Sequence, residues 1–169
     1  LLADLTATFV NLAADRVDEE IGRGLREIAQ FVGVDRTTLM EFSPDGSQLP
    51  RVHGYARAGI DPALGMVASE QFPWYTQQRR QGVTLVLRRL PDDLPAEAEA
   101  ARRYCAEQGL KSHLAIPLQV GDTIVAAITF GTLTRFLDWP DELVSRLRLL
   151  GKVFADAMTG KVTEDVVAG

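Results

Sequence analysis

The sequence predicts an α/β (α+β) domain in which helices cover both faces of a central antiparallel sheet of five or six strands. Two apolar runs, residues 111–120 and 123–133, are joined by the turn Gly121-Asp122 and are flanked by helix signals. Residues of both parities are apolar in the second run, which is typical of a strand covered on both sides. Alternating helix and strand signals elsewhere in the chain favour the same fold class.

The N-terminal segment carries two helix patterns. Apolar residues recur at helical spacing from Leu2 to Leu12, which predicts a first helix over residues 1–12. A second apolar stripe extends to Val32, and we expect Asp15 to cap its start and Gly33 to end it.

The middle of the chain predicts a strand, a turn and a return strand, followed by a long loop. Residues 34–42 and 49–57 are rich in strand formers, and the Ser-Pro-Asp-Gly sequence at 43–46 turns the chain between them. Residues 58–71 have weak periodicity and are expected to form a functional loop.

The remaining elements are delimited by proline and glycine. The expected elements are a short helix at 72–81, a strand at 83–88, a helix at 95–108, the two strands already described, and a final helix from Pro140 to about Met158.

Composition limits the class of protein. The chain has 169 residues and a net charge of −5, with dispersed arginines, which argues against a nucleic-acid surface. One cysteine excludes an internal disulfide. No apolar run reaches the length of a membrane span and no signal peptide is recognisable, so we expect a cytoplasmic protein without membrane contact. We expect one domain over residues 1–160 with a tail at 161–169, cut from a longer protein that carries an output domain.

Motifs for catalysis are not found, so the domain is not expected to be an enzyme or to hold a cofactor or metal. The sequence has no phosphate-binding loop, no His-Glu-x-x-His, no paired cysteines and no nucleophile elbow. Asp92 and Asp93 lie beside prolines, where a role in a turn is favoured over metal binding. For His53 and His113 a hydrogen-bonded strand histidine is favoured over a metal ligand. For Cys105 a small core residue is favoured over a reactive thiol.

Several segments resemble the GAF sensory domains. The most characteristic is KSHLAIPLQVGD at residues 111–122 with the strand after it, and similar segments are VDR at 34–36, FPW at 72–74 and WPDEL at 139–143. The resemblance implies strand order 2-1-5-4-3, with the first, second and last helices on one face. It also implies a sensory domain of the kind found in bacterial histidine kinases and AAA+ enhancer-binding transcription activators.

The residues that three known activities of GAF relatives require are not found in this chain. Bilin-carrying relatives have a Cys-His pair nine and eight residues before the helix-ending glycine, and Ala100 and Ala101 stand there before Gly109. Reductases of methionine sulfoxide in this family need a second cysteine. The Asn-Lys…Phe-Asp-Glu signature of cyclic-nucleotide binders is not found.

The candidate ligand site suggested by the resemblance lies between the sheet and the third and fourth helices. Its candidate residues are His53, Tyr55, Trp74, Tyr104 and Cys105. Aromatic residues with polar tips suit a small-molecule pocket, but they equally suit a filled core, and both interpretations stay open. Arg57 and Arg79 could receive an anionic ligand, although a role as surface charges is favoured.

The expected function is regulation: the domain binds a small ligand, or only a partner domain, and relays the change to its output domain. The alternative is a structural dimerisation module without a ligand; a reductase is disfavoured by the single cysteine. We expect a homodimer formed by the helix at residues 1–12 against the final helix, through Leu2, Leu5, Phe9 and Leu12.

Overall fold

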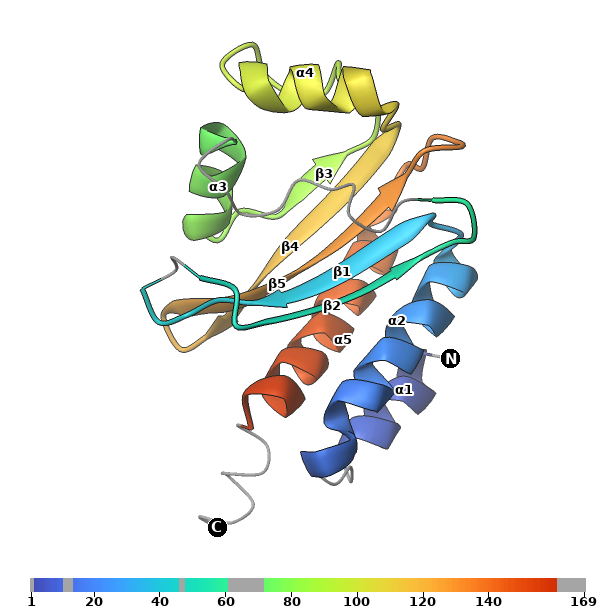
Figure 1. The fold of residues 1–169 in the computed structure, drawn as a ribbon, viewed down its shortest axis with the longest axis vertical. Helices are drawn as coiled ribbons and strands as arrows, with labels where there is room; N and C mark the ends of the chain where they lie inside the picture. Colours follow the sequence, from blue (N-terminus) through green and yellow to red (C-terminus); the bar gives the residue numbers. More distant parts are fainter. Residues whose placement is uncertain (1, 11–13, 46–47, 61–71, 161–169) are drawn as a thin grey trace.

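The order of helices and strands along the chain follows the predicted pattern (Figure 1). The computed structural model describes residues 2–10, 14–45, 48–60 and 72–160. The elements are α1 (Leu2–Val10), a 3₁₀ turn (Ala14–Arg16), α2 (Val17–Val32), β1 (Arg36–Glu41), β2 (Arg51–Ala56), α3 (Pro73–Arg80), β3 (Leu85–Leu87), α4 (Glu99–Gln108), β4 (Ser112–Val120), β5 (Thr123–Thr132) and α5 (Asp141–Thr159).

The strands form one five-stranded sheet in the order β2-β1-β5-β4-β3, and all neighbours are antiparallel. The predicted fold class and strand order are therefore confirmed, with five strands. β5 lies at the centre, where Ile128 faces Leu39 of β1 on one side and Ile116 of β4 on the other.

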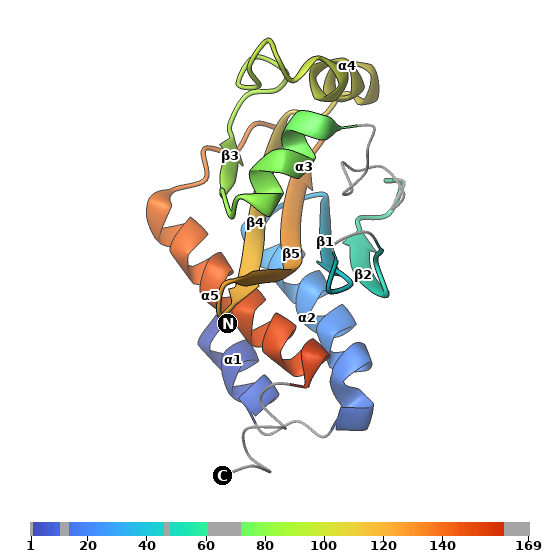
Figure 2. The ribbon, with the colours of Figure 1, turned by 90° about the vertical axis from the view of Figure 1, so that its left-hand side faces the viewer.

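The sheet separates two layers of helices. Figures 1 and 2 show α1, α2 and α5 on one face and α3 and α4 on the other. The first face carries the main core, in which Leu39, Ile116 and Ile128 are completely buried. The second face carries a smaller core that includes Leu87, Cys105 and other residues of β3, α3 and α4. Period-two alternation along the strands sends neighbouring residues into different cores.

The helix α5 lies very close to the sheet. A Cβ atom on Gly151 would stand 2.9 Å from Cγ2 of Ile128 and 3.1 Å from Cδ2 of Leu118. These separations are too short for a side chain, so glycine allows the α5 backbone to contact β4 and β5. Any movement of the central strands would therefore change their contact with α5.

Two side chains of α1 that were expected at a dimer interface, those of Leu5 and Phe9, pack within the chain. Leu5 and Phe9 are each 3% exposed, and the ring of Phe9 lies 4.8 Å from that of Phe154 in α5. They cannot contribute to an intermolecular contact while α1 stays packed. Leu12 lies outside the described residues, and the structure does not describe the side chain of Leu2. The homodimer itself stays a prediction, because a single chain does not test it.

Two helix starts differ from the prediction. Asp15 lies in the 3₁₀ turn, and α2 begins after Arg16 without a side-chain cap. The helix predicted from Pro95 begins at Glu99. Residues before it form turns, because the Arg102 guanidinium donates to the carbonyls of Pro91 and Leu94 and holds that segment against α4. Most of the predicted loop, residues 61–71, and the predicted tail, residues 161–169, lie outside the described residues.

The position of β5 in the middle of the sheet, covered on both faces, can be tested by mutation. Replacing Ile128, which is completely buried, by aspartate is expected to lower the free energy of unfolding by several kcal/mol, because the carboxylate would have no partner in an apolar layer. Val52→Asp on the edge strand β2 is the control; Val52 is 52% exposed, and a change within about 1 kcal/mol is expected there. Chemical denaturation measures both. Equal losses in the two variants would contradict the assignment of β5 as the central strand.

Candidate functional site

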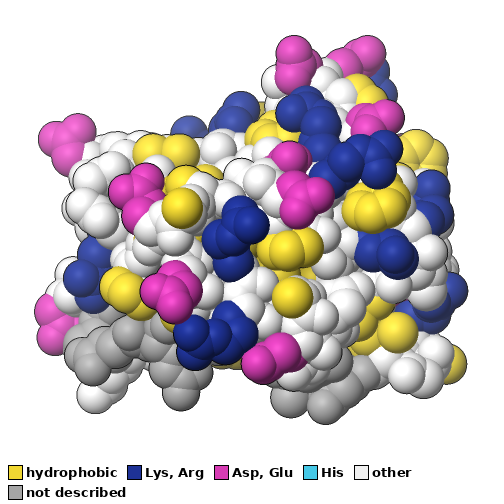
Figure 3. Space-filling model, turned by 90° about the horizontal axis from the view of Figure 1, so that it is seen from above, with side chains coloured by type: hydrophobic (Ala, Val, Ile, Leu, Met, Phe, Trp, Pro, Cys, Tyr) yellow, Lys and Arg dark blue, Asp and Glu magenta, His cyan; other side chains and the backbone are white. Residues whose placement is uncertain are grey.

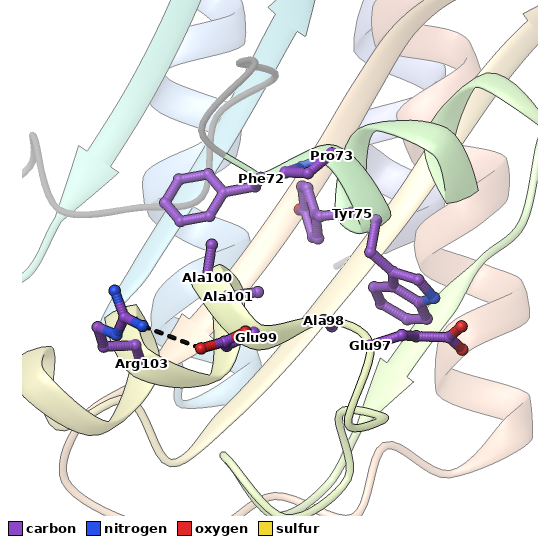
Figure 4. A pocket seen from close by; sticks show the side chains of 10 residues that line it. Phe72, Pro73, Tyr75, Glu97, Ala98, Glu99, Ala100, Ala101 and Arg103 are labelled. Atoms are coloured by element: carbon purple, nitrogen blue, oxygen red, sulfur yellow. Dashed lines mark hydrogen bonds and ion pairs between the residues drawn. The ribbon is translucent and has the colours of Figure 1, made fainter.

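A groove lies between α3 and α4 on the face of the sheet opposite α5. Its volume is about 340 Å³, within the range of small-molecule sites. Figure 4 shows Phe72 and Tyr75 on one side, with Ala98, Ala100 and Ala101 across from them. The complete lining is Phe72, Pro73, Trp74, Tyr75, Glu97, Ala98, Glu99, Ala100, Ala101 and Arg103.

The groove exists because large side chains of one helix face small ones of the other. Pro73 starts α3, where its missing N–H is not needed. The Phe72 ring meets the Tyr104 ring edge-on at 5.2 Å and so fixes the start of α3 against α4. Ala98 and Ala101 are each 2% exposed, and their short side chains leave space for the groove above them.

Charged residues at the groove are exposed. Glu99 and Arg103 of α4 form an ion pair at 3.1 Å, drawn as the dashed line in Figure 4, and both side chains are largely in solvent. Acidic and basic side chains are interspersed over the end of the molecule shown in Figure 3. Exposed pairs of this kind contribute little free energy, so selectivity of the groove would depend on its apolar walls.

The five predicted site residues do not lie together, because His53 and Tyr55 are on the opposite face of the sheet. In β2 they pair with Leu39 and Thr37 of β1. His53 Nε2 lies 3.3 Å from Asp18 Oδ1 of α2, and Tyr55 packs against the main core. Parity correctly placed the two residues on one face, but it cannot tell which face that is. Their expected position beside the groove was therefore wrong.

Trp74, Tyr104 and Cys105 are on the groove side. Trp74 lines the groove, and Tyr104 packs behind Phe72. Cys105 is completely buried below α4, and burial raises the pKa of its thiol to about 12, against an opposing effect of Arg36. A thiol with so little thiolate character is packed as a core residue.

Beneath α3 is a buried polar cluster of which sequence reasoning found only parts. The Tyr75 hydroxyl lies 2.9 Å from Nε2 of His113 in β4, and both side chains are buried. Burial, helped by the charge of Arg36, lowers the pKa of His113 to about 3, so its ring is neutral. Burial also raises the pKa of Tyr75, so its hydroxyl keeps its proton. Tyr75 was not predicted as part of a site, because its partner His113 lies 38 residues away in the sequence and no local pattern links the two.

The two arginines considered for an anion differ in their surroundings. Arg57 is half exposed and pairs with the buried carboxylate of Asp35 at 2.9 Å. Asp35 also accepts from the backbone N–H groups of Leu133 and Thr134, so this pair holds strand ends together. Arg79, favoured as a surface charge, is 7% exposed and lies under α3 with its guanidinium 4.2 Å from the centre of the Phe42 ring. For Arg79 the surface interpretation was wrong.

No group of three potential metal ligands occurs among the residues that the structure describes. Asp93, considered for a metal, accepts from the backbone N–H groups of Arg88 and Arg89 at 2.8 and 2.9 Å and so closes a turn. No described helix combines the length and the hydrophobicity that a membrane crossing requires.

Comparison with known proteins identifies the family. The sequence model of the GAF domain matches residues 17–158, and the chain therefore belongs to the GAF family. Among curated proteins none matches its sequence.

Solved structures of GAF domains have the same fold. The phycoerythrobilin-bound GAF domain of a cyanobacterial phytochrome is 16% identical, with TM-score 0.70, 97% of this chain covered and 95% of that one. The GAF domain of the cyanobacteriochrome TePixJ is 12% identical, with TM-score 0.68, 92% of this chain covered and 94% of that one. The phytochrome photosensory core module of Stigmatella aurantiaca is 15% identical, with TM-score 0.69, 95% of this chain covered and 36% of that one.

The lowered pKa of His113 predicts that the stability of the fold depends on pH. The pKa of His113 is about 3 in the fold, below the ordinary 6.5, so the unfolded chain binds the proton more readily. The free energy of unfolding is expected to fall by several kcal/mol as the pH drops from about 6.5 towards 3. His113→Gln has an uncharged amide that can still form a hydrogen bond with Tyr75 but cannot take up a proton, so its free energy of unfolding is expected to fall clearly less over the same pH range. His53→Gln is the control for removal of a histidine, and denaturant titrations across pH measure all three. Parallel curves for the parent and His113→Gln would contradict the expectation.

Proposed function

We propose that this GAF domain is a regulatory sensor that binds a small ligand in the groove between α3 and α4. The groove itself carries the proposal: a cavity of ligand size, lined by Phe72, Trp74 and Tyr75, lies on the face of the sheet that α3 and α4 cover. Its solved neighbours include a GAF domain described as phycoerythrobilin-bound, which supports a ligand-binding role for the fold.

The same proposal includes a route to an attached output domain. Strand β4 contacts both layers, since Ala115 packs in the core below α3 and α4 while Leu114 and Ile116 pack in the core below α5. A ligand that changes the spacing of α3 and α4 would displace this strand against α5. To change output, the ligand must prefer one of two arrangements of the terminal helices α1 and α5.

We further propose that the domain has no catalytic activity and no covalently bound bilin. Ala100 and Ala101, which stand where bilin-carrying relatives have Cys and His, both line the groove. Their methyl groups offer neither a nucleophile nor an imidazole, and the thiol of Cys105 is buried under α4.

Expression with a bilin tests this part of the proposal. The denatured protein is expected to carry no visible absorbance, because no accessible thiol can form the thioether. Zinc-induced fluorescence of the denatured band and the intact mass report a covalent adduct, and Cys105→Ser shows whether the single thiol is responsible. A bilin mass that survives denaturation would overturn the proposal.

The alternative is a structural module that dimerises without a ligand. In that case the groove stays filled with solvent, and the chain purified from its own host carries no additional mass. This alternative and the sensor proposal differ in what native mass spectrometry detects.

Native mass spectrometry of protein from its host is therefore the deciding experiment. The parent is expected to retain a small molecule, and Ala100→Trp, which fills the groove, is expected to lose it. Ala96→Trp places the same indole on an exposed residue that does not line the groove and serves as the control. A parent without additional mass, or a ligand retained by Ala100→Trp, would contradict ligand binding in this groove.

A further inference from the structure

A second, smaller cavity lies on the inner side of α3, between that helix and the sheet. It measures about 10 Å³, which holds one water-sized group. Arg79 and Tyr75 of α3 and Thr129 of β5 line it among apolar side chains, of which Val83 is 38% exposed. The cavity is thus next to the protein surface but is dominated by apolar walls.

The guanidinium of Arg79 is incompletely satisfied there. Its Nη1 atom is buried and has no hydrogen-bond partner among the described residues. The ring of Phe42 stabilises one face of the guanidinium, at 4.2 Å from the ring centre, but a ring face does not replace an in-plane acceptor. A buried cationic donor without an acceptor is costly, and such a group marks a place where an anion would be stabilised.

The tautomer of His113 makes the hydroxyl of Tyr75, a residue that lines the same cavity, available as a second donor. Nδ1 of His113 and Nη2 of Arg36 would each lie 3.7 Å from a Cβ on Gly131, and the charge of Arg36 acts on the ring of His113. A neutral ring places its lone pair, not its proton, towards a cation, which puts the proton on Nε2. Nε2–H then donates to the Tyr75 oxygen, and the Tyr75 hydroxyl proton is left to donate elsewhere.

We propose that Arg79 and Tyr75 bind the carboxylate of a small organic acid in the cavity below α3. One carboxylate oxygen matches the water-sized space and accepts from Arg79 Nη1 and the Tyr75 hydroxyl. The rest of the acid lies outside this space, towards Val83, where the cavity meets the protein surface. The site goes beyond the groove, with which it shares only Tyr75 in its lining.

Matched probes and matched variants test the site. Acetate, propionate and benzoate are titrated against their neutral amides and against chloride and phosphate at equal ionic strength, with binding followed by calorimetry and the melting temperature. The carboxylates are expected to bind and stabilise the parent, and their amides are not. Arg79→Met, and Arg79→Lys as the variant that keeps the charge, are expected to weaken carboxylate binding at least about tenfold.

The adjacent arginine provides the control. Arg80→Met removes the same charge from an exposed position on the same helix and is expected to bind carboxylates like the parent. Tyr75→Phe is expected to bind more weakly than the parent. Equal binding of acid and amide, loss of binding in Arg80→Met, or no response of the parent to any carboxylate would overturn the site. If the parent responds to no carboxylate, the cavity holds water only. Ligand binding in the groove between α3 and α4 is tested separately, by native mass spectrometry.

Discussion

The structure depends on a single strand that is apolar on both faces. β5 lies between β1 and β4, and its apolar residues alternate between the main core and a small cluster on the other face, in which Ala127 packs with Met40 and Phe42. A strand of this kind is stable only when helices cover both faces of the sheet. Space for a ligand can therefore exist between the covering helices or beneath them, but not on an open sheet.

The two covered faces are packed differently. The α5 face holds the largest buried side chains, among them Trp139, Phe130 and Phe154, and the helix approaches so closely that Gly151 has no room for a Cβ. The α3 face combines small residues such as Ala101 and Ala115 with buried polar ones such as His113 and Arg79. Dense packing resists deformation, whereas a layer of small and polar side chains can rearrange at lower cost. We therefore expect ligands to act on the α3 face and α5 to report the change.

Sequence patterns predicted the elements and the strand order more completely than the site. The two apolar runs and the Gly121-Asp122 turn between them were sufficient for β4 and β5, since these signals are local. The face to which His53 points depends on how β2 pairs with β1, which no local pattern contains. The burial of Arg79 was likewise invisible, because an arginine at the end of a short helix is ordinarily solvated and only the tertiary contact with Phe42 covers it. Tyr75 is important because of a single partner, His113, which lies 38 residues away in the sequence.

An unsatisfied donor in a sensor has a physical use. A buried hydrogen-bonding group without a partner costs about 1–3 kcal/mol, and a charged one costs more. Any ligand that supplies the acceptor to Arg79 recovers this free energy only in the arrangement where the donor is buried. A difference of about 1–3 kcal/mol corresponds to a coupling of about 5- to 150-fold between ligand binding and the conformational equilibrium. The imperfect core below α3 would thus supply the preference for one state that regulation requires, while the closely packed α5 face keeps the domain folded in both states.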